Sequence, residues 1–195
     1  IAKAYAAGVP MGGAIQASDR PLEFFVSAQK DPGVAGNPGT DLERVQIVKG
    51  WVSQDGRTHE RVIDVAGAVN DASVDPMTCA RVGQGSRRLC TVWQDPDFDP
   101  AQPAFYYARV LENPTCRWST LQCQASGVNP FSAQCEAQAS KANQRAQEGG
   151  ASGDVYSKCC LDEQAQPFYS PLIRERAWTS PIWYRQAHGP RTSGG

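Results

Sequence analysis

The sequence is poor in histidine and has neither a long apolar run nor an excess of basic charge. Histidines, long apolar runs and an excess of basic charge are typical of many catalytic, membrane-spanning and nucleic-acid-binding chains, respectively. It holds two histidines, His59 and His188, in 195 residues. No apolar run approaches the roughly 18 residues that a membrane-spanning helix requires. Its 19 basic and 20 acidic residues leave a net charge of -1. This balance, with no basic run, favours neither nucleic acid nor an anionic membrane as a partner.

Catalytic and cofactor motifs are missing as well. The sequence contains no Gly-x-Ser-x-Gly, no His-x-His and no phosphate-cradling glycine loop. No Cys-x-x-Cys pair occurs, so the spacing gives no support to a zinc site. His59 falls close to a predicted turn and His188 in the C-terminal tail, and nothing places them in one site. We therefore predict no catalytic, cofactor-binding or metal-binding residues.

Cysteine is the residue type that stands out. An oxidising compartment, the periplasm or the exterior, with disulfide bonds explains these cysteines better than a metal site does. Cys79 and Cys90 bracket a short polar loop and are predicted to pair. Adjacent Cys159 and Cys160 are expected to reach different partners, because a vicinal bridge is strained. An odd count leaves one thiol free or paired with another chain. The seven candidates for disulfides are Cys79, Cys90, Cys116, Cys123, Cys135, Cys159 and Cys160.

The 18 glycines and 14 prolines are typical of short strands joined by turns and loops. Asp55-Gly56 between two β-rich runs predicts a hairpin whose two central residues take positive φ. Residues 104–112 carry aromatic and aliphatic side chains on both faces, which predicts a central strand of a sandwich. The predicted strands are 22–30, 43–53, 57–66, 89–94, 104–112 and 177–185, and 31–41 is a predicted loop.

Residues 115–170 have a different character, with most of the cysteines and a helical pattern over 131–148. Cys135 lies near the start of this predicted helix on its apolar face, which favours a bridge or a buried thiol over a nucleophile. We predict a mainly β fold: one immunoglobulin-like antiparallel sandwich over 1–195, with a disulfide-stapled insertion at 115–170 that contains one helix. Residues 186–195 are predicted to form a flexible tail.

Two groups of side chains allow a binding role. Asp95, Asp97 and Asp99 alternate as at the start of a calcium loop. Two of the three precede proline and no bidentate glutamate follows, so turn-forming aspartates are the preferred interpretation. The tryptophans offer a platform for carbohydrate or peptide, although four of them lie in or beside predicted strands, where core packing is expected. They are Trp51, Trp93, Trp118, Trp178 and Trp183.

Five segments of the sequence form a recognisable series. They are GVPMGG at 8–13, LERVQIVKGWV at 42–52, DGRTHERVIDVA at 55–66, DPDFDPAQPAFYYARVLENP at 95–114 and RERAWTSPIWY at 174–184. Together they resemble a large bacterial family of unknown function, itself similar to the carbaryl-hydrolase-like branch of the polymerase-and-histidinol-phosphatase (PHP) metallohydrolases. The resemblance runs from about residue 8 to 185, and the Cys-rich part with CRWST at 116–120 looks like a subfamily variant.

The chain starts at Ile1 without a Met, and we interpret Ile1 as a processed or truncated start. The resemblance implies that this chain is the C-terminal region of a longer protein. The metal-binding residues of such proteins lie in an N-terminal part that begins with an Asp-Thr-His-x-His motif, which is absent here, so no catalytic residue carries over. We expect a non-catalytic accessory domain of a secreted or periplasmic metal-dependent hydrolase. It would pack on the N-terminal metal domain or mediate assembly with another subunit or copy.

Two alternatives remain at this point. The first is a stand-alone structural or binding subunit of a larger complex, which the odd cysteine count allows. The second is a carbohydrate-binding module that uses the tryptophans.

Overall fold

A computed structural model describes residues 6, 8–160, 164 and 166–186. Ile1, His188 and all of the predicted 186–195 tail except Gln186 lie outside the described residues. Strands dominate, so the predicted mainly β fold is confirmed. No helix among the described residues is long and apolar enough to span a bilayer. The chain forms two compact units, which we call the sheet unit (Ile1–Asn70, Gly85–Glu112 and Arg176–Gly195) and the insert unit (Asp71–Gln84 and Asn113–Glu175).

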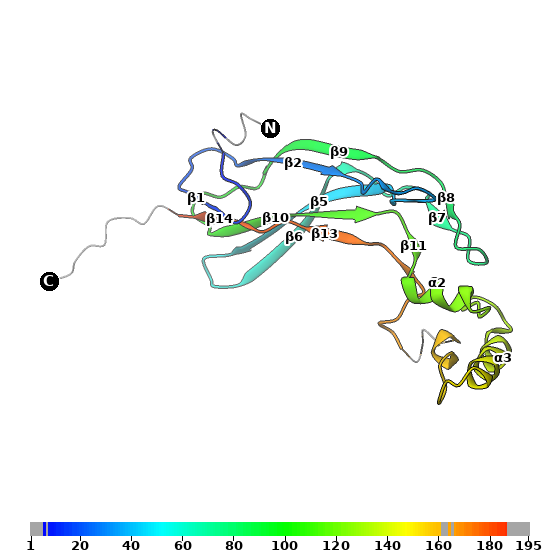
Figure 1. Ribbon diagram of the computed structural model, residues 1–195. Coiled ribbons are helices and arrows are strands. Elements are labelled where there is room, and N and C mark those ends of the chain that lie inside the picture. The colour runs from blue at the N-terminus through cyan, green and yellow to red at the C-terminus, as the bar shows by residue number, and fades with distance from the viewer. Residues whose placement is uncertain (1–5, 7, 161–163, 165, 187–195) are drawn as a thin grey trace. The chain divides into compact units, whose positions relative to one another are not determined.

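The sheet unit is built on a six-stranded sheet (Figure 1). Strand β10 lies between β5 and β14, which confirms its predicted central position. The predicted strand at 177–185 is split in two around Pro181, whose missing N–H cannot join a ladder. The order is β1-β14-β10-β5-β6 with β13 also on β10: β1 (Ala14–Gln16), β5 (Leu42–Val52), β6 (Thr58–Gly67), β10 (Ala104–Glu112), β13 (Arg176–Trp178) and β14 (Ile182–Arg185).

A second layer covers one face of this sheet. Strands β2 (Glu23–Gln29) and β9 (Arg88–Gln94) pair antiparallel and lie above it in Figure 1. The ring of Phe24 on β2 contacts that of Tyr106 on β10, with centroids 4.5 Å apart. Two layers around one core are compatible with the predicted sandwich. The buried core residues are Leu22, Phe24, Ile47, Ala104, Tyr106 and Tyr184.

The β5–β6 hairpin turns at Ser53–Arg57, where the sequence predicts it. Gly56 takes φ of 81°, whereas Asp55 is not among the residues with positive φ. The Ser53 and Arg57 backbones are joined by an N–H···O=C bond of 2.9 Å, and Gly56 N–H donates to Ser53 O. The expectation of two positive-φ residues is therefore wrong. The turn has a single left-handed glycine, as in three-residue hairpin loops that end in a bulge.

The insert unit contains α2 (Trp118–Ala125), α3 (Cys135–Glu148) and a short 3-10 helix, η1 (Ser157–Cys160). Helix α3 is the predicted one and begins at Cys135 rather than at residue 131, whereas α2 was not predicted. Cys123 bonds Cys159 and Cys135 bonds Cys160. The prediction that the adjacent cysteines reach different partners is confirmed. Of the two states predicted for Cys135, a bridge or a buried thiol, the structure shows the bridge.

Short two-stranded pieces complete the described structure. In the sheet unit, β3 (Gly33–Val34) and β4 (Asn37–Pro38) pair within the predicted 31–41 loop. In the insert unit, β7 (Ser73–Val74) pairs with β8 (Arg81–Val82), and β11 (Thr115–Cys116) pairs with β12 (Leu172–Ile173).

The third disulfide joins Cys79 to Cys116, so the predicted Cys79–Cys90 pair is wrong. Cys90 is the free cysteine and is exposed. It lies on β9 between Leu89 and Thr91, which are both more buried. Because side chains alternate along a strand, Cys90 faces away from the core.

Cys90 is expected to be the one thiol that reacts in the native protein. An exposed thiol is accessible to a soluble maleimide, whereas bridged cysteines are not. Intact-mass spectrometry should show a single adduct, and the Cys90→Ser variant should show none. Two or more adducts on the unreduced protein would contradict the three bridges.

Candidate binding cleft

We call the face of the six-stranded sheet that β2 and β9 cover its inner face. A cleft of about 310 Å³ lies on this face, between the β5–β6 pair and the segment that follows β9. Register explains how the strands supply its walls. Lys49 on β5 lies opposite Arg61 on β6 and opposite Tyr106 on β10, so the three side chains share one face. Trp51 is two residues further along β5 on the same face, opposite His59.

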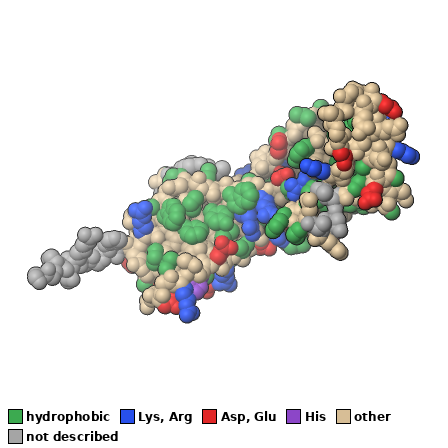
Figure 2. Space-filling view, turned by 90° about the horizontal axis from the view of Figure 1, so that it is seen from below, with side chains coloured by type: hydrophobic (Ala, Val, Ile, Leu, Met, Phe, Trp, Pro, Cys, Tyr) green, Lys and Arg blue, Asp and Glu red, His purple; other side chains and the backbone are tan. Residues whose placement is uncertain are grey.

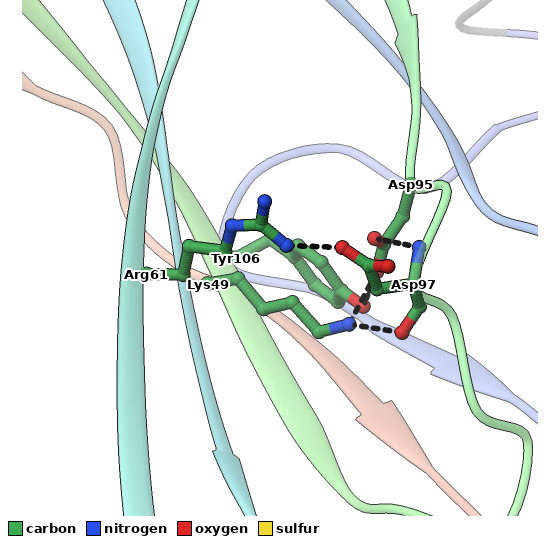
Figure 3. Close-up of polar contacts among 5 residues, drawn as sticks. All are labelled: Lys49, Arg61, Asp95, Asp97 and Tyr106. Carbon is green, nitrogen blue, oxygen red and sulfur yellow. Dashed lines mark hydrogen bonds and ion pairs between the residues drawn. The ribbon is translucent and has the colours of Figure 1, made fainter.

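A buried ion pair forms the base of the cleft (Figure 3). Lys49 Nζ donates to Asp95 Oδ2 at 2.6 Å and to the Asp97 backbone oxygen at 2.8 Å. The Tyr106 hydroxyl donates to the same Asp95 oxygen at 2.7 Å. Lys49 is 5% exposed and Asp95 1% exposed. Burying both charges is tolerable only because each has a partner, so the pair fixes the β9–β10 segment to β5.

Tyr106 acts here as a hydrogen-bond donor. Burial raises the pKa of its hydroxyl, and the hydrogen bond to Asp95 and the negative charge of that carboxylate raise it further. The phenol therefore stays protonated in the physiological range. It is suited to holding Asp95 and unsuited to act as a base or a nucleophile.

A second ion pair lies at the mouth of the cleft, where Arg61 contacts the carboxylate of Asp97 (Figure 3). Both side chains are more than half exposed, at 58% and 60%. An exposed pair of this kind adds little to stability. Because both side chains are exposed, their polar atoms are accessible to a molecule that enters the cleft.

The three aspartates of the calcium alternative all line this cleft, and each has a protein donor. Asp95 Oδ1 accepts from the backbone N–H of Asp97 at 3.0 Å, and Asp99 Oδ1 accepts from that of Ala101 at 2.8 Å. These are the bonds of turn-forming aspartates. Among the described residues, no three His, Cys, Asp or Glu side chains are grouped to hold a metal ion.

The β5–β6 turn brings together a serine, a histidine and an aspartate that the sequence analysis did not connect. Ser53 Oγ lies 2.5 Å from Asp55 Oδ1 and 2.8 Å from His59 Nε2. The hydrogen bond from Ser53, followed by that from the Arg57 backbone, lowers the pKa of Asp55. In a catalytic triad the carboxylate orients the histidine. Here Asp55 accepts a hydrogen bond from the serine hydroxyl instead, which indicates a turn-stabilising role.

The opposite, outer face of the sheet carries exposed aromatic and aliphatic side chains (Figure 2). Trp183 lies opposite Phe105, with ring centroids 5.5 Å apart. The Phe105 ring lies over Gly50, where a Cβ would come within 2.3 Å of it. Trp178 is 60% exposed and Trp183 46% exposed, so core packing is wrong for these two. We call Val52, Val62, Phe105, Tyr107, Trp178 and Trp183 the outer apolar face.

The comparisons with known proteins give one match. A family model described as "Protein of unknown function (DUF3604)" matches residues 1–148. No curated protein and no solved structure matches the chain.

Proposed function

The chain belongs to the DUF3604 family of proteins of unknown function. We propose that it acts as a non-catalytic accessory domain of a secreted or periplasmic metal-dependent hydrolase. It would pack through the outer apolar face onto a metal-binding domain that precedes it in the same polypeptide. The observation that carries the proposal is that face itself. Its groups suit packing, and no residue of the described cleft is arranged as a catalytic triad or a metal-binding group.

The composition of the outer apolar face supports a protein partner. Interface cores are enriched in Trp, Tyr, Phe and Arg, and exposed apolar clusters with a polar rim mark interaction sites. A row of hydrogen-bonded polar side chains on β10, β5 and β6 borders the outer apolar face. Arg109 Nε donates to Gln46 Oε1 at 2.8 Å, and Gln46 Nε2 donates to Asp64 Oδ1 at 2.6 Å. Aromatic anchors beside an ordered polar rim are what a stable interface uses.

The path of the chain supports a partner from the same polypeptide. Strand β1 pairs with β14, and Ala14 lies opposite Trp183. A domain joined ahead of β1 would therefore be tethered next to Trp183, one of the two tryptophans of the outer apolar face. A short tether raises the effective concentration of the partner and favours an intramolecular contact.

The three disulfides support the compartment in the proposal. Their cysteines, 79–116, 123–159 and 135–160, form bonds that persist in oxidising environments and are rare in the cytosol. Secretion or export to the periplasm supplies such an environment.

Protection of Trp183 tests the proposed packing. Hydroxyl-radical footprinting would compare the isolated chain with the longer parent polypeptide, reading tryptophan oxidation by mass spectrometry. Oxidation of Trp183 and Trp178 should fall by about fivefold in the parent, since the centre of an interface is fully buried. Trp118 of the insert unit, 68% exposed, is the internal control and should keep its oxidation rate.

Two outcomes would overturn this proposal. Equal oxidation of Trp183 in both forms would show that no preceding domain covers the face. Protection in the isolated chain that increases with protein concentration would assign the face to a second copy of the chain. That second outcome would favour the stand-alone subunit.

A further inference from the structure

We propose that the inner cleft binds one ring of a neutral sugar, held against Trp51 and Trp93 and hydrogen-bonded by Arg61 and Asp97. This inference concerns the inner face and does not depend on what covers the outer apolar face.

The aromatic walls are held in place by their neighbours. Both Trp51 and Trp93 line the cleft and are partly buried. The His59 ring stacks on Trp51 with centroids 5.1 Å apart. The Phe24 ring packs against that of Trp93 with centroids 5.9 Å apart. Indole rings fixed in this way offer flat apolar surface at low cost in entropy. The C–H face of a pyranose ring is the apolar surface that such walls would accept.

The charges of the cleft favour a neutral ligand. Lys49 is paired with Asp95, and Arg61 is paired with Asp97, so neither cation lacks a counter-ion. An anionic or cationic ligand would have to break one of these pairs to gain an ion pair of its own. Sugar hydroxyls both donate and accept, so they can bond to Asp97 and Arg61 without separating the charges. Gln102, also in the lining, adds an amide with the same dual character.

One donor at the base of the cleft is still available. An ammonium group has three hydrogens. Lys49 has two acceptors among the described residues, Asp95 Oδ2 and the Asp97 backbone oxygen. Its Nζ also lies 5.3 Å from the centroid of the Trp51 ring. A hydroxyl placed over Trp51 could accept the third hydrogen from a side chain that is itself only 5% exposed.

The size of the cleft limits the ligand. About 310 Å³ is at the lower end of small-molecule pockets. The space suits a single ring with its hydroxyls, either a free monosaccharide or the end of a glycan.

Tryptophan fluorescence titration tests the proposal with named probes. Glucose, galactose, mannose, xylose and N-acetylglucosamine would each be added to the full chain up to about 10 mM, which detects millimolar affinity. At least one should give a saturable change. Arg61→Ala should weaken that binding by about tenfold, a loss of about 1.4 kcal/mol. Because Arg61 is exposed, this variant should keep the fold.

Matched variants separate the cleft from other tryptophans. Trp51→Ala should abolish the response, whereas Trp178→Ala on the outer apolar face should retain it. Circular dichroism would establish that each variant is folded. The proposal is overturned if no neutral sugar gives a saturable change, or if binding survives Arg61→Ala and Trp51→Ala unchanged. It is equally overturned if glucuronic acid or glucosamine binds more tightly than every neutral sugar.

Discussion

Replacing Asp95 with alanine is expected to lower the free energy of unfolding of the sheet unit by about 3–5 kcal/mol. The substitution leaves the Lys49 ammonium, 5% exposed, without its counter-ion. It also removes the acceptor of the Tyr106 hydroxyl, which lies 2.7 Å from Asp95. Each buried donor left without a partner loses the compensation for its desolvation.

The control for this prediction is the exposed pair in the same cleft. Asp97→Ala breaks the contact with Arg61, whose side chain is 58% exposed, and should cost less than about 1 kcal/mol. Its backbone oxygen, which also holds Lys49, is retained in this variant. The double variant Lys49→Met with Asp95→Leu removes both buried charges and should recover most of the loss. Urea denaturation followed by circular dichroism measures all three. Equal losses for Asp95→Ala and Asp97→Ala would contradict a buried, paired role for Asp95.

Local pattern was sufficient for the five longest strands of the sheet unit, β2, β5, β6, β9 and β10, but it did not predict the short strands β1, β3 and β4. Strand β10 runs over 104–112 as predicted, and β5 and β6 differ from their predicted bounds by one residue at each end. Val62 and Asp64 face one side of β6 and Ile63 and Val65 the other, because side chains alternate along a strand. This pattern does not indicate which face of the sheet a second layer covers. Strand β10 carries apolar side chains on both faces, yet Phe105 and Tyr107 remain partly exposed.

The cleft was beyond prediction because its contacts are distant in sequence. Asp95 and Lys49 are 46 residues apart, and only the folded sheet brings them together. The aspartate repeat drew attention to Asp95, Asp97 and Asp99 as a calcium alternative, but nothing local links them to a lysine inside a hydrophobic strand. A buried lysine in such a strand requires an acidic partner elsewhere. That rule indicates that Lys49 has an acidic partner, but it does not identify which residue the partner is.

The position of Cys90 could have been found. Leu89, Thr91 and Trp93 occupy one face of β9, which places Cys90 on the other face with Arg88 and Val92. A cysteine on the outward face of a strand is poorly placed to reach Cys79. Closeness of two cysteines in sequence therefore does not establish a bridge when strand periodicity turns one of them away from the core.

Removing the two disulfides that hold the helices is expected to unfold the insert unit. The buried cluster there consists of small side chains, Val128, Ala139 and Ala142, and of bridged cysteines. Such a core is too small to offset the chain entropy of both helices. The bridges span 36 and 25 residues, and loops of that length contribute about 3–4 kcal/mol each.

The test replaces Cys123, Cys135, Cys159 and Cys160 with serine and compares hydrogen exchange with that of the original protein. Amides of α2 and α3 should lose their protection, and the helical circular dichroism signal should fall with them. Amides of β5 and β10 should keep theirs, because these strands belong to the sheet unit and contain none of the four cysteines. Cys90→Ser is the matched control and should change stability by no more than about 0.5 kcal/mol. Protected helices in the four-serine variant would show that packing alone holds the insert unit. Loss of protection throughout β5 and β10 would show that the two units fold as one.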